Sequence, residues 1–470
     1  MRTEGMPLHG IRILEAGHQW AAPIAMEFLA GMGAEVIKVE STVHPDMVRS
    51  GSYPDGVPGE GYWNRGGRFN DVNRNKRGIT LDLTKPEGCA LFRRLAAVSD
   101  VVAENFTPRV MANFGLDYEA LRKVRGDLIM LSVTGFGHSG PWRDYAGRGS
   151  GLEATSSLTY MTGYHGEGPM KSGVPYTDIP AAYHAAFAVL AALNHRDMTG
   201  EGQWIDLAMY EIGASAMTEA LLDADWNGRI AKPRGNRHGA FAPQGCYPCA
   251  GLDEWLALSV TSESEWRALA ALMGRPELAE DARFATRAAR AEHHDELDGA
   301  IAAWTKGQQP QALMERLQRA GLSAGRVLTS KDALLDPHYR LRGTFPVVRH
   351  LPETRVGDRA QTGMPVRMSA TPCHLESPAP MLGQDNAAVL GGLIGLTAPE
   401  LNALTDTGII GDRPVATVRG AASEGKRPDR DAARTYDEDY QALLGITPPL
   451  RQAGGRSPGG HRGTGKGGAS

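Results

Sequence analysis

The stretch IRILEAGHQWAAPIAMEFLAGMGAEVIKVE, residues 11–40, decides the fold class. Residues 11–16 form a short apolar run typical of a buried strand, and residues 34–40 form a second one. Residues 24–32 between them are apolar enough for a helix. A strand, a helix and a strand within about 30 residues indicate a parallel sheet with crossover helices. We therefore predict an α/β fold.

The same pattern continues along the first half of the chain. Each further helix is followed by an apolar strand, which extends the predicted parallel sheet. The predicted helices cover 86–97, 118–124, an Ala-rich span from about 179 to 195, and 212–225; the predicted strands cover 101–104, 128–133 and 203–209.

The composition changes after residue 226, where Gly, Pro, Arg and His predominate. A strand and three helices then indicate a smaller mid-chain α+β domain, and a Pro-rich return leads to a last helix pair near 385–405. Beyond about 413 the low apolar content predicts disorder, with helix potential only at 440–446. The predicted segments are 6–225, a linker at 226–250, a small domain at 251–335, the return and last helices at 336–412, and a tail at 413–470.

Composition excludes several classes of protein. The 470 residues carry a net charge of −4, which gives no general affinity for nucleic acid or anionic membrane. No apolar run is long enough to span a bilayer, and no apolar region follows Arg2 as in a secretory signal. The four cysteines are too few and scattered for a disulfide framework, so we expect a cytoplasmic protein.

The loop after the first strand lacks the glycines of a dinucleotide site, since Gly17 is followed by HQWAAP. Bulky residues there keep the backbone from a pyrophosphate, so a nicotinamide-dependent dehydrogenase is not expected even though Glu40 stands where a ribose-binding acid would be. A nucleotide-containing ligand at the carboxyl ends of the strands stays open, because open α/β sheets bind ligands there.

Two polar clusters have competing interpretations. The cations and amides of NRNKR, residues 73–77, are suited to binding phosphates, but a solvated charged turn is favoured. Cys246 and Cys249, with His238 upstream, have no second ligand pair at zinc spacing, so we predict packing in a strand turn and no metal. The chain has no G-x-S-x-G, P-loop, H-E-x-x-H or kinase signature.

Asp178 directly precedes the Ala-rich helix, with Pro180 in its first turn. Helix caps are far commoner than nucleophiles, so the sequence favours an N-cap. Both roles are compatible, because a helix N-terminus keeps a carboxylate ionised. A partly desolvated carboxylate can attack a thioester, and the free N–H groups of the first turn could then stabilise an oxyanion.

Several blocks of the sequence, in order and spacing from about residue 8 to 410, resemble the family III CoA-transferases, which include formyl-CoA transferase and the α-methylacyl-CoA racemases. Any one block alone would be weak, but together with Asp178 and its helix they are specific. The blocks are GAEVIKVE (33–40), NRNKRGITLDLTKPEG (73–88), VVAENFTPRVMANFGL (101–116), LSVTGFGHSGP (131–141), TGEGQWIDLAM (199–209) and PAPMLGQDNAAVL (378–390).

The resemblance implies a Rossmann-like, parallel-sheet large domain that binds coenzyme A and is built from both chain ends, 6–225 and 336–412. It also implies a homodimer of interlocked subunits. Coenzyme A and acyl-CoA would be substrates, with no permanently bound cofactor, and a carboxylic acid would be the acceptor. Asp178 matches the catalytic aspartate, which forms aspartyl anhydride and aspartyl-CoA thioester intermediates. The matching coenzyme A contacts are Trp20, Ala21, Leu81, Asp82, Thr84, Asn105, Phe106, Thr107, Arg148 and Gly149.

Two alternatives to transfer stay open. A racemase of this family uses a His opposite the aspartate, and that position falls at or near Gly149, where no base is available. Glu153 is the nearest acid and is not expected to serve, so transferase is favoured over racemase. A coenzyme A-binding protein without catalysis is the other alternative, against which the intact Asp178 argues.

Overall fold

The computed structural model describes residues 4–415 and 440–445. Most of the tail predicted to be disordered from residue 413 lies outside the described residues. The helix expected at 440–446 is present as α19 (Tyr440–Leu444). Among the helices of the described residues, none combines the length and apolar character needed to cross a membrane.

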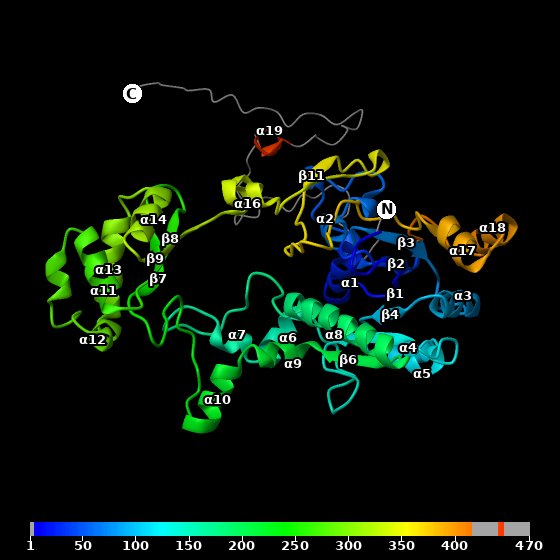
Figure 1. Ribbon diagram of the computed structural model, residues 1–470, viewed down its shortest axis with the longest axis horizontal. Helices are drawn as coiled ribbons and strands as arrows, with labels where there is room; N and C mark the ends of the chain where they lie inside the picture. The colour runs from blue at the N-terminus through cyan, green and yellow to red at the C-terminus, as the bar shows by residue number, and fades with distance from the viewer. Residues whose placement is uncertain (1–3, 416–439, 446–470) are drawn as a thin grey trace, which may run out of the picture. The chain divides into compact units, whose positions relative to one another are not determined.

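A six-stranded sheet confirms the predicted α/β class (Figure 1). Its strand order is β3-β2-β1-β4-β5-β6, and the pairs β2–β3, β1–β4, β4–β5 and β5–β6 are parallel. Their side chains are buried almost throughout, except on β6, as expected for strands covered on both faces. The strands are β1 (Arg12–Glu15), β2 (Glu35–Glu40), β3 (Lys76–Thr80), β4 (Val101–Glu104), β5 (Ile129–Thr134) and β6 (Trp204–Ala208).

The predicted helices are present, one of them divided in two, and further short helices occur between them. The helix expected over 212–225 is two helices, α9 and α10, separated at Ala216 and Met217. At this break the hydroxyls of Ser215 and Thr218 donate to backbone carbonyls three residues earlier, in competition with the regular helix pattern. The helices are α1 (Ala21–Gly31), α2 (Gly67–Val72), α3 (Pro86–Ala97), α4 (Arg109–Asn113), α5 (Tyr118–Leu121), α6 (Gly149–Thr155), α7 (Leu158–Met161), α8 (Asp178–Thr199), α9 (Met209–Ser215), α10 (Thr218–Asn227), α11 (Glu263–Leu272), α12 (Arg287–Glu292), α13 (His294–Thr305), α14 (Pro310–Arg319), α15 (Ser330–Leu335), α16 (Pro337–Arg342), α17 (Asn386–Ile394) and α18 (Ala398–Asp406).

The chain divides into two compact units, each described by itself. The first unit contains Met1–Gly10, Ala30–Asp82 and Gly343–Ser470, as far as these ranges are described, and the second contains Ile11–Leu29 and Leu83–Arg342. β2 and β3 belong to the first unit, and β1, β4, β5 and β6 belong to the second.

In the first unit, β3 is bound by residues from the far end of the chain. The Gly78 amide donates to Asp385 Oδ2 at 2.8 Å, and the Thr80 hydroxyl donates to the carbonyl of Gly411 at 2.7 Å. A Cβ at Gly78 would lie 2.8 Å from Pro380, so only a glycine at this position of β3 leaves room for the returning segment. The C-terminal residues therefore complete the environment of β3.

The segment 73–77, which leads into β3, also contacts the returning chain, and the prediction of a solvated turn there is wrong. Asn73 and Arg74 are buried, and the Lys76 ammonium donates to Asn73 Oδ1 at 3.0 Å. The Asn75 amide donates to the carbonyl of His374 at 2.6 Å and accepts from the Ser377 amide at 2.9 Å. These polar groups hold the returning chain, so the structure gives no support to the phosphate alternative either.

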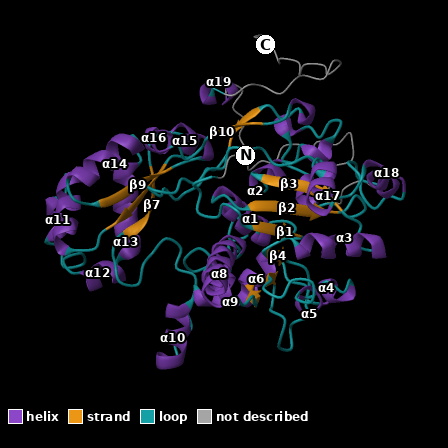
Figure 2. Cartoon of the chain, turned by 45° about the vertical axis from the view of Figure 1, so that its right-hand side comes forward, coloured by secondary structure: helices purple, strands orange, loops and turns teal. Residues whose placement is uncertain are grey.

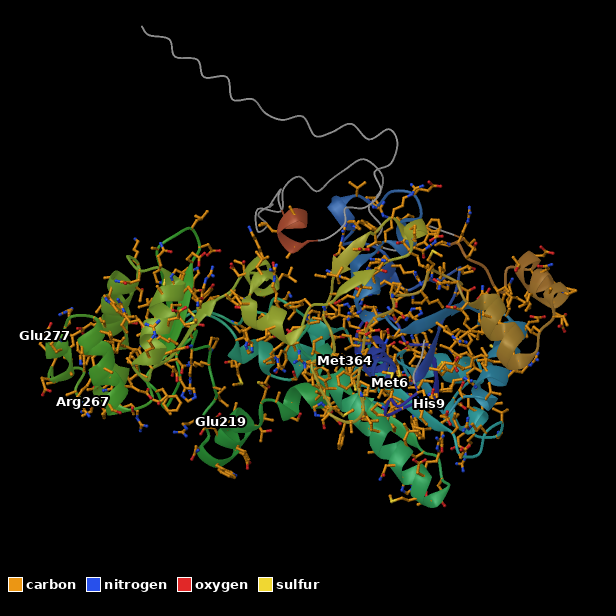
Figure 3. The ribbon with its side chains drawn as sticks, turned by 45° about the horizontal axis from the view of Figure 1, so that its top comes forward. Met6, His9, Glu219, Arg267, Glu277 and Met364 are labelled. Atoms are coloured by element: carbon orange, nitrogen blue, oxygen red, sulfur yellow. The ribbon has the colours of Figure 1, made fainter. Side chains whose placement is uncertain are left out.

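The turn from α1 into β2 is set by close packing. Gly33 has φ +104°, and a Cβ there would lie 2.6 Å from Cβ of Met6. A Cβ at Gly31 would lie 2.5 Å from Sδ of Met364. The two methionines, far apart in the sequence, thus both reach this turn (Figure 3). Glycine is required at Gly33 for both its backbone angle and its space.

In the second unit, the Ala-rich helix α8 packs on β5 and β6. Its small residues Ala181, Ala182 and Ala185 are fully buried, whereas Phe187 is 71% exposed. Small side chains let the helix axis approach the sheet closely, which positions the first turn of α8, where Asp178 lies.

The mid-chain residues form an antiparallel sheet of β7 (Gln244–Pro248), β8 (Trp255–Ser259) and β9 (Ser323–Val327), with helices packed on it (Figure 2). Trp266, Leu297 and Leu317 belong to its core, one from each of α11, α13 and α14. The mixed α+β character predicted here is confirmed, and β10 (Val347–Arg349) pairs with β11 (Asp358–Ala360) farther along the chain.

Candidate active site

Asp178 is the first residue of α8, so the helix begins one residue earlier than predicted and Asp178 is inside it rather than at its N-cap. Thr177 is the N-cap, and its side chain makes no capping hydrogen bond. The amides of Ile179 and Ala181 donate to the carbonyls of Tyr176 and Thr177, and Pro180 has no N–H. The N-cap interpretation is therefore wrong, and these first-turn amides are not free to stabilise an oxyanion as expected.

The Asp178 carboxyl is partly buried, and among the described residues no Lys or Arg forms an ion pair with it. Burial raises its pKa, the charge of Glu153 raises it further, and a backbone hydrogen bond lowers it, with a net pKa of about 6. The carboxylate is thus more basic than an ordinary aspartate but still mainly ionised at neutral pH. Such a group is suited to nucleophilic attack.

Helix α6 lies directly against this carboxylate. A Cβ at Gly149 would lie 2.3 Å from Asp178 Oδ2 and 2.7 Å from Cβ of Pro175, so this position has no room for a side chain. Glu153, one turn later on the same helix, is 1% exposed and accepts the amide proton of Tyr176 at 2.6 Å. The structure thus brings Gly149 to Asp178, together with Glu153, an acid that was not expected to serve at the site.

The loops after β1 and β4 are joined by Asn105. Its Oδ1 accepts from the His18 amide at 2.7 Å, and its Nδ2 donates to the His18 carbonyl at 2.7 Å. The rings of His18 and Phe106 meet edge to face at 5.4 Å. Trp20 and Ala21 follow directly on the first loop, so the structure brings these predicted residues to one edge of the sheet.

The remaining predicted coenzyme A contacts fall in both units of the chain. Leu81 and Asp82 belong to the first unit, where their amides donate to the carbonyls of Glu40 and Ile409. Thr84 is in the second unit and is exposed, as is Arg148, the N-cap residue of α6. The carbonyl of Thr107 accepts from the amide of Val110 at 2.9 Å, which starts α4.

A buried acid at the end of β4 was not predicted. Glu104 is 1% exposed, and its Oε2 accepts from the Phe106 amide at 2.7 Å. Burial raises its pKa to about 7 against opposing hydrogen bonds from Ser132 and Phe106. Nε2 of His138 lies 3.9 Å from Oε1 of Glu104. The sequence feature that could have indicated Glu104 is its place at the end of the otherwise apolar strand VVAE.

Two open pockets lie among the mid-chain residues, with volumes of about 280 and 510 Å³. Neither is lined by a predicted site residue. Cys246 lines the larger pocket from β7, and Cys249 is buried; both are free thiols. Within the described ranges no three His, Cys, Asp or Glu side chains gather as metal ligands.

Comparison with known proteins gives a consistent result. The family model described as CoA-transferase family III matches residues 8–386. The chain is 38% identical to succinyl-CoA–D-citramalate CoA-transferase of Chloroflexus aurantiacus over 84% of this chain and 96% of that protein. It is 35% identical to succinate–glutarate CoA-transferase of Agrobacterium fabrum over 82% and 96%. A crystal structure of a CaiB/BaiF family protein from Brucella suis matches with a TM-score of 0.74 and 32% identity, covering 83% of this chain and 99% of that one.

Proposed function

This chain belongs to CoA-transferase family III and is an enzyme of the CoA-transferase type, and from that premise we propose that Asp178 carries the acyl group during transfer. Coenzyme A would enter as part of the acyl-CoA substrate, and a carboxylic acid would accept it. The observation that carries the proposal is a partly buried carboxylate without a cationic partner among the described residues, at the start of a 22-residue helix and against a glycine.

The carboxylate acts as a nucleophile in each half of the reaction. An Asp178 oxygen attacks the thioester carbonyl of the donor, the C–S bond breaks, and the coenzyme A thiolate leaves from a mixed anhydride. The thiolate then attacks the aspartyl carbonyl and releases the donor acid, which leaves an aspartyl-CoA thioester. The acceptor carboxylate attacks that thioester, and the thiolate finally attacks the acceptor acyl group of the second anhydride and frees Asp178.

No net proton is taken up or released in this sequence, so a general base is not required. Carboxylates and thiolates exchange at each step, and the intermediates are close in reactivity. The pKa of about 6 favours this chemistry, because a more basic carboxylate is a stronger nucleophile while it remains ionised at neutral pH.

We assign the coenzyme A contacts to the loops at the carboxyl edge of the sheet, which is the usual ligand site of open α/β sheets. Asn105 ties the two loops together, which supports a preformed surface at Trp20 and Ala21 and at Phe106 and Thr107. The exposed guanidinium of Arg148 is available for a phosphate. Further contacts are proposed at Leu81, Asp82, Thr84 and Gly149.

The substrate class follows from the relatives. Both relatives described above are named for succinyl-CoA or succinate and for a second dicarboxylic acid. We propose succinyl-CoA as donor and a small dicarboxylic acid as acceptor for this chain as well.

Racemisation is less well supported. Two-base chemistry needs a second base across the substrate carbon from Asp178. The position expected for that base is Gly149, where a Cβ would lie 2.3 Å from Asp178 Oδ2. Glu153 is buried and engaged with the backbone of Tyr176, so it does not face an open site as a base would.

We further propose that the active form is a homodimer, with the predicted large domain at 6–225 and 336–412 and the small domain at 251–335. Helix α10 has no buried residue, and Leu221, Leu222 and Trp226 are exposed on it, the last to 74%. A second copy of the chain is the proposed cover for these side chains, because exposed apolar clusters mark interaction surfaces. Sedimentation equilibrium of the full chain should give twice the monomer mass, and a monomer at micromolar concentration would contradict this.

The test of Asp178 is capture of its acyl intermediate. Enzyme treated with succinyl-CoA and then hydroxylamine should carry a hydroxamate at Asp178, detected by peptide mass spectrometry. Asp178→Ala should show no hydroxamate and no transfer from succinyl-CoA to a labelled dicarboxylic acid. Glu277→Gln is the matched control, because Glu277 is an exposed acid in the mid-chain turn Pro276–Ala279, away from Asp178 in the sequence and outside every proposed site (Figure 3).

The outcomes separate the alternatives. Deuterium uptake at the α-carbon of an acyl-CoA without an acceptor would indicate a racemase. Coenzyme A binding with neither labelling nor transfer for any donor and acceptor pair would indicate a binding protein. Unchanged hydroxamate formation in Asp178→Ala would exclude Asp178 as the acyl carrier.

A further inference from the structure

Helix α6 holds the chain just before Asp178 through Glu153. Its Oε1 accepts from the Tyr176 amide at 2.6 Å, and its Oε2 lies 3.0 Å from the Ser172 hydroxyl. Both partners lie in the six residues before Asp178, here called the strap (residues 172–177). One buried side chain thus fixes the strap at two points.

The same helix contacts the end of the strap a third time. Gly149 and Glu153 are four residues apart and share a face of α6. The carbonyl of Gly149 lies 3.4 Å from the hydroxyl of Thr177, which is fully buried. The missing Cβ of Gly149 leaves the space that Asp178 Oδ2 and Pro175 occupy. α6 therefore determines where the Asp178 carboxylate lies.

Helix α6 is itself backed by α9. A Cβ at Gly213 would lie 2.4 Å from the hydroxyl oxygen of Ser156 and 3.2 Å from Cγ2 of Thr177. Ser156 in turn donates to the Glu153 carbonyl at 3.2 Å. Helix α9 therefore packs closely against both the end of α6 and the end of the strap.

The charge of Glu153 requires an explanation beyond this geometry. A glutamine could make the same two contacts, since its carbonyl accepts from the Tyr176 amide and its NH2 group can donate to Ser172. A carboxylate instead places a second negative charge near Asp178 and makes the nucleophile more basic. Since like charges in a buried site are costly, a functional role is the simplest account.

We propose that Glu153 is a positioning residue of the acylation step, which fixes the Asp178 carboxylate through the strap and places a second negative charge beside it. This inference rests on the proposed function of Asp178. Glu153 has no part in the covalent steps, since it is engaged with the strap.

The experiment measures the rate of hydroxylamine-trappable acylation by succinyl-CoA between pH 5 and pH 8. In the wild type the rate should fall as the pH decreases through about 6, because Asp178 becomes protonated. Glu153→Gln keeps the contacts and removes the charge, so the fall should move to lower pH by roughly one unit. Glu153→Ala releases the strap, and its acylation at pH 8 should be slower by about 10²-fold, as expected when a reacting group is misplaced by about 1 Å.

Glu211→Gln is the control, because Glu211 is an exposed acid in the first turn of the neighbouring α9. Its rate and pH profile should match the wild type. A Glu153→Gln profile that coincides with the wild type, or a Glu153→Ala enzyme that acylates at the wild-type rate, overturns the proposal. If the Ala variant does not fold, the Gln profile alone decides. Failure of the wild type to acylate at all would reject the function of Asp178 instead.

Discussion

Two acids, one fully and one partly buried, have opposite electrostatic surroundings in this chain. Glu40 ends β2 in the first unit, and its carboxylate accepts from Arg49 Nε at 2.8 Å and from the Arg49 Nη2 at 2.6 Å. Burial raises the pKa of Glu40, but Arg49 and Lys38 outweigh it, so the pKa lies below its usual value. Asp178 starts α8 in the second unit with another acid nearby, and its pKa rises to about 6.

The difference separates a structural acid from a reactive one. At Glu40 each charge is paired: Arg49 also lies over the ring of Phe69 at 3.5 Å, and the Lys38 ammonium is 3.2 Å from Asp46. At Asp178 the protein leaves the charge uncompensated, which costs stability and gains nucleophilicity. Four predictions test this contrast.

The largest expected effect is on catalysis. Asp178→Asn should lower the rate of coenzyme A transfer by at least about 10⁴-fold, because the acyl carrier is lost. Exchange of labelled succinate into succinyl-CoA measures this rate. Glu40→Gln, which removes the charge of a structural acid, should retain transfer in whatever fraction of the chain is folded. If Asp178→Asn exchanged labelled succinate at near the wild-type rate, Asp178 would not be a reactive acid and its contrast with Glu40 would be wrong.

The second largest effect is on the stability of the folded protein, through the ion pair of Glu40 with Arg49. Arg49→Leu leaves Glu40 buried without its cation and should lower the free energy of unfolding by about 3–5 kcal/mol. Urea denaturation measures the change. Arg77→Leu is the control, since its ion pair with Glu35 is partly exposed to solvent and should be worth less than about 1 kcal/mol. Equal losses in the two variants would show that burial of the pair is unimportant.

The third effect concerns the pH dependence of stability. The folded pKa of Asp178 lies above its ordinary value of 3.8, so its stabilising contribution is present below pH 4 and is lost as the pH rises through 6. Asp178→Asn should therefore be more stable than the wild type by about 2 kcal/mol at pH 8 and not at pH 4. Glu40 has a lowered pKa, so Glu40→Gln should lose stability at pH 8 and less of it at low pH. Urea denaturation of both variants at pH 4 and pH 8 tests whether their stability changes at pH 8 have opposite signs.

The smallest effect tests the space beside Asp178. Gly149→Ala places a methyl group too close to Asp178 Oδ2, so the carboxylate must shift, and acylation should slow about 10-fold. Gly151→Ala is the matched control on the same helix, because a Cβ there meets nothing within 4 Å. Rapid-mix acylation with succinyl-CoA compares the two. Equal rates would show that the carboxylate can shift without loss.

The sequence predicted the architecture well because the sheet depends on local patterns. Each strand is a short apolar run that must be buried, and the spacing between runs leaves room only for crossover helices. The division of α9 from α10 was not predictable, because the bonds of Ser215 and Thr218 compete with helix geometry at one place only.

The site was predicted in part. The sequence predicted that Asp178 lies at the start of a long helix. That it is the first helical residue rather than the N-cap depends on the backbone hydrogen bonds that the carbonyls of Tyr176 and Thr177 accept, which the sequence does not show. Glu153 was considered only as a base, and its contacts before Asp178 were not predicted, because its partners are backbone and hydroxyl groups about 20 residues away and no local pattern encodes such a pairing. The residues at 73–77 were misjudged for the same reason, since Asn75 binds residues 299 positions later.

The binding of β3 by the end of the chain affects how the protein is made. The Thr80 hydroxyl finds its acceptor at Gly411, 331 residues later. A ribosome adding 5–20 residues per second needs roughly 15–65 seconds to supply that partner. During that time β3, an edge strand of the sheet, is in the nascent chain without its C-terminal cover. Chaperones that shield apolar edges during translation should therefore matter more for this half of the molecule than for the rest.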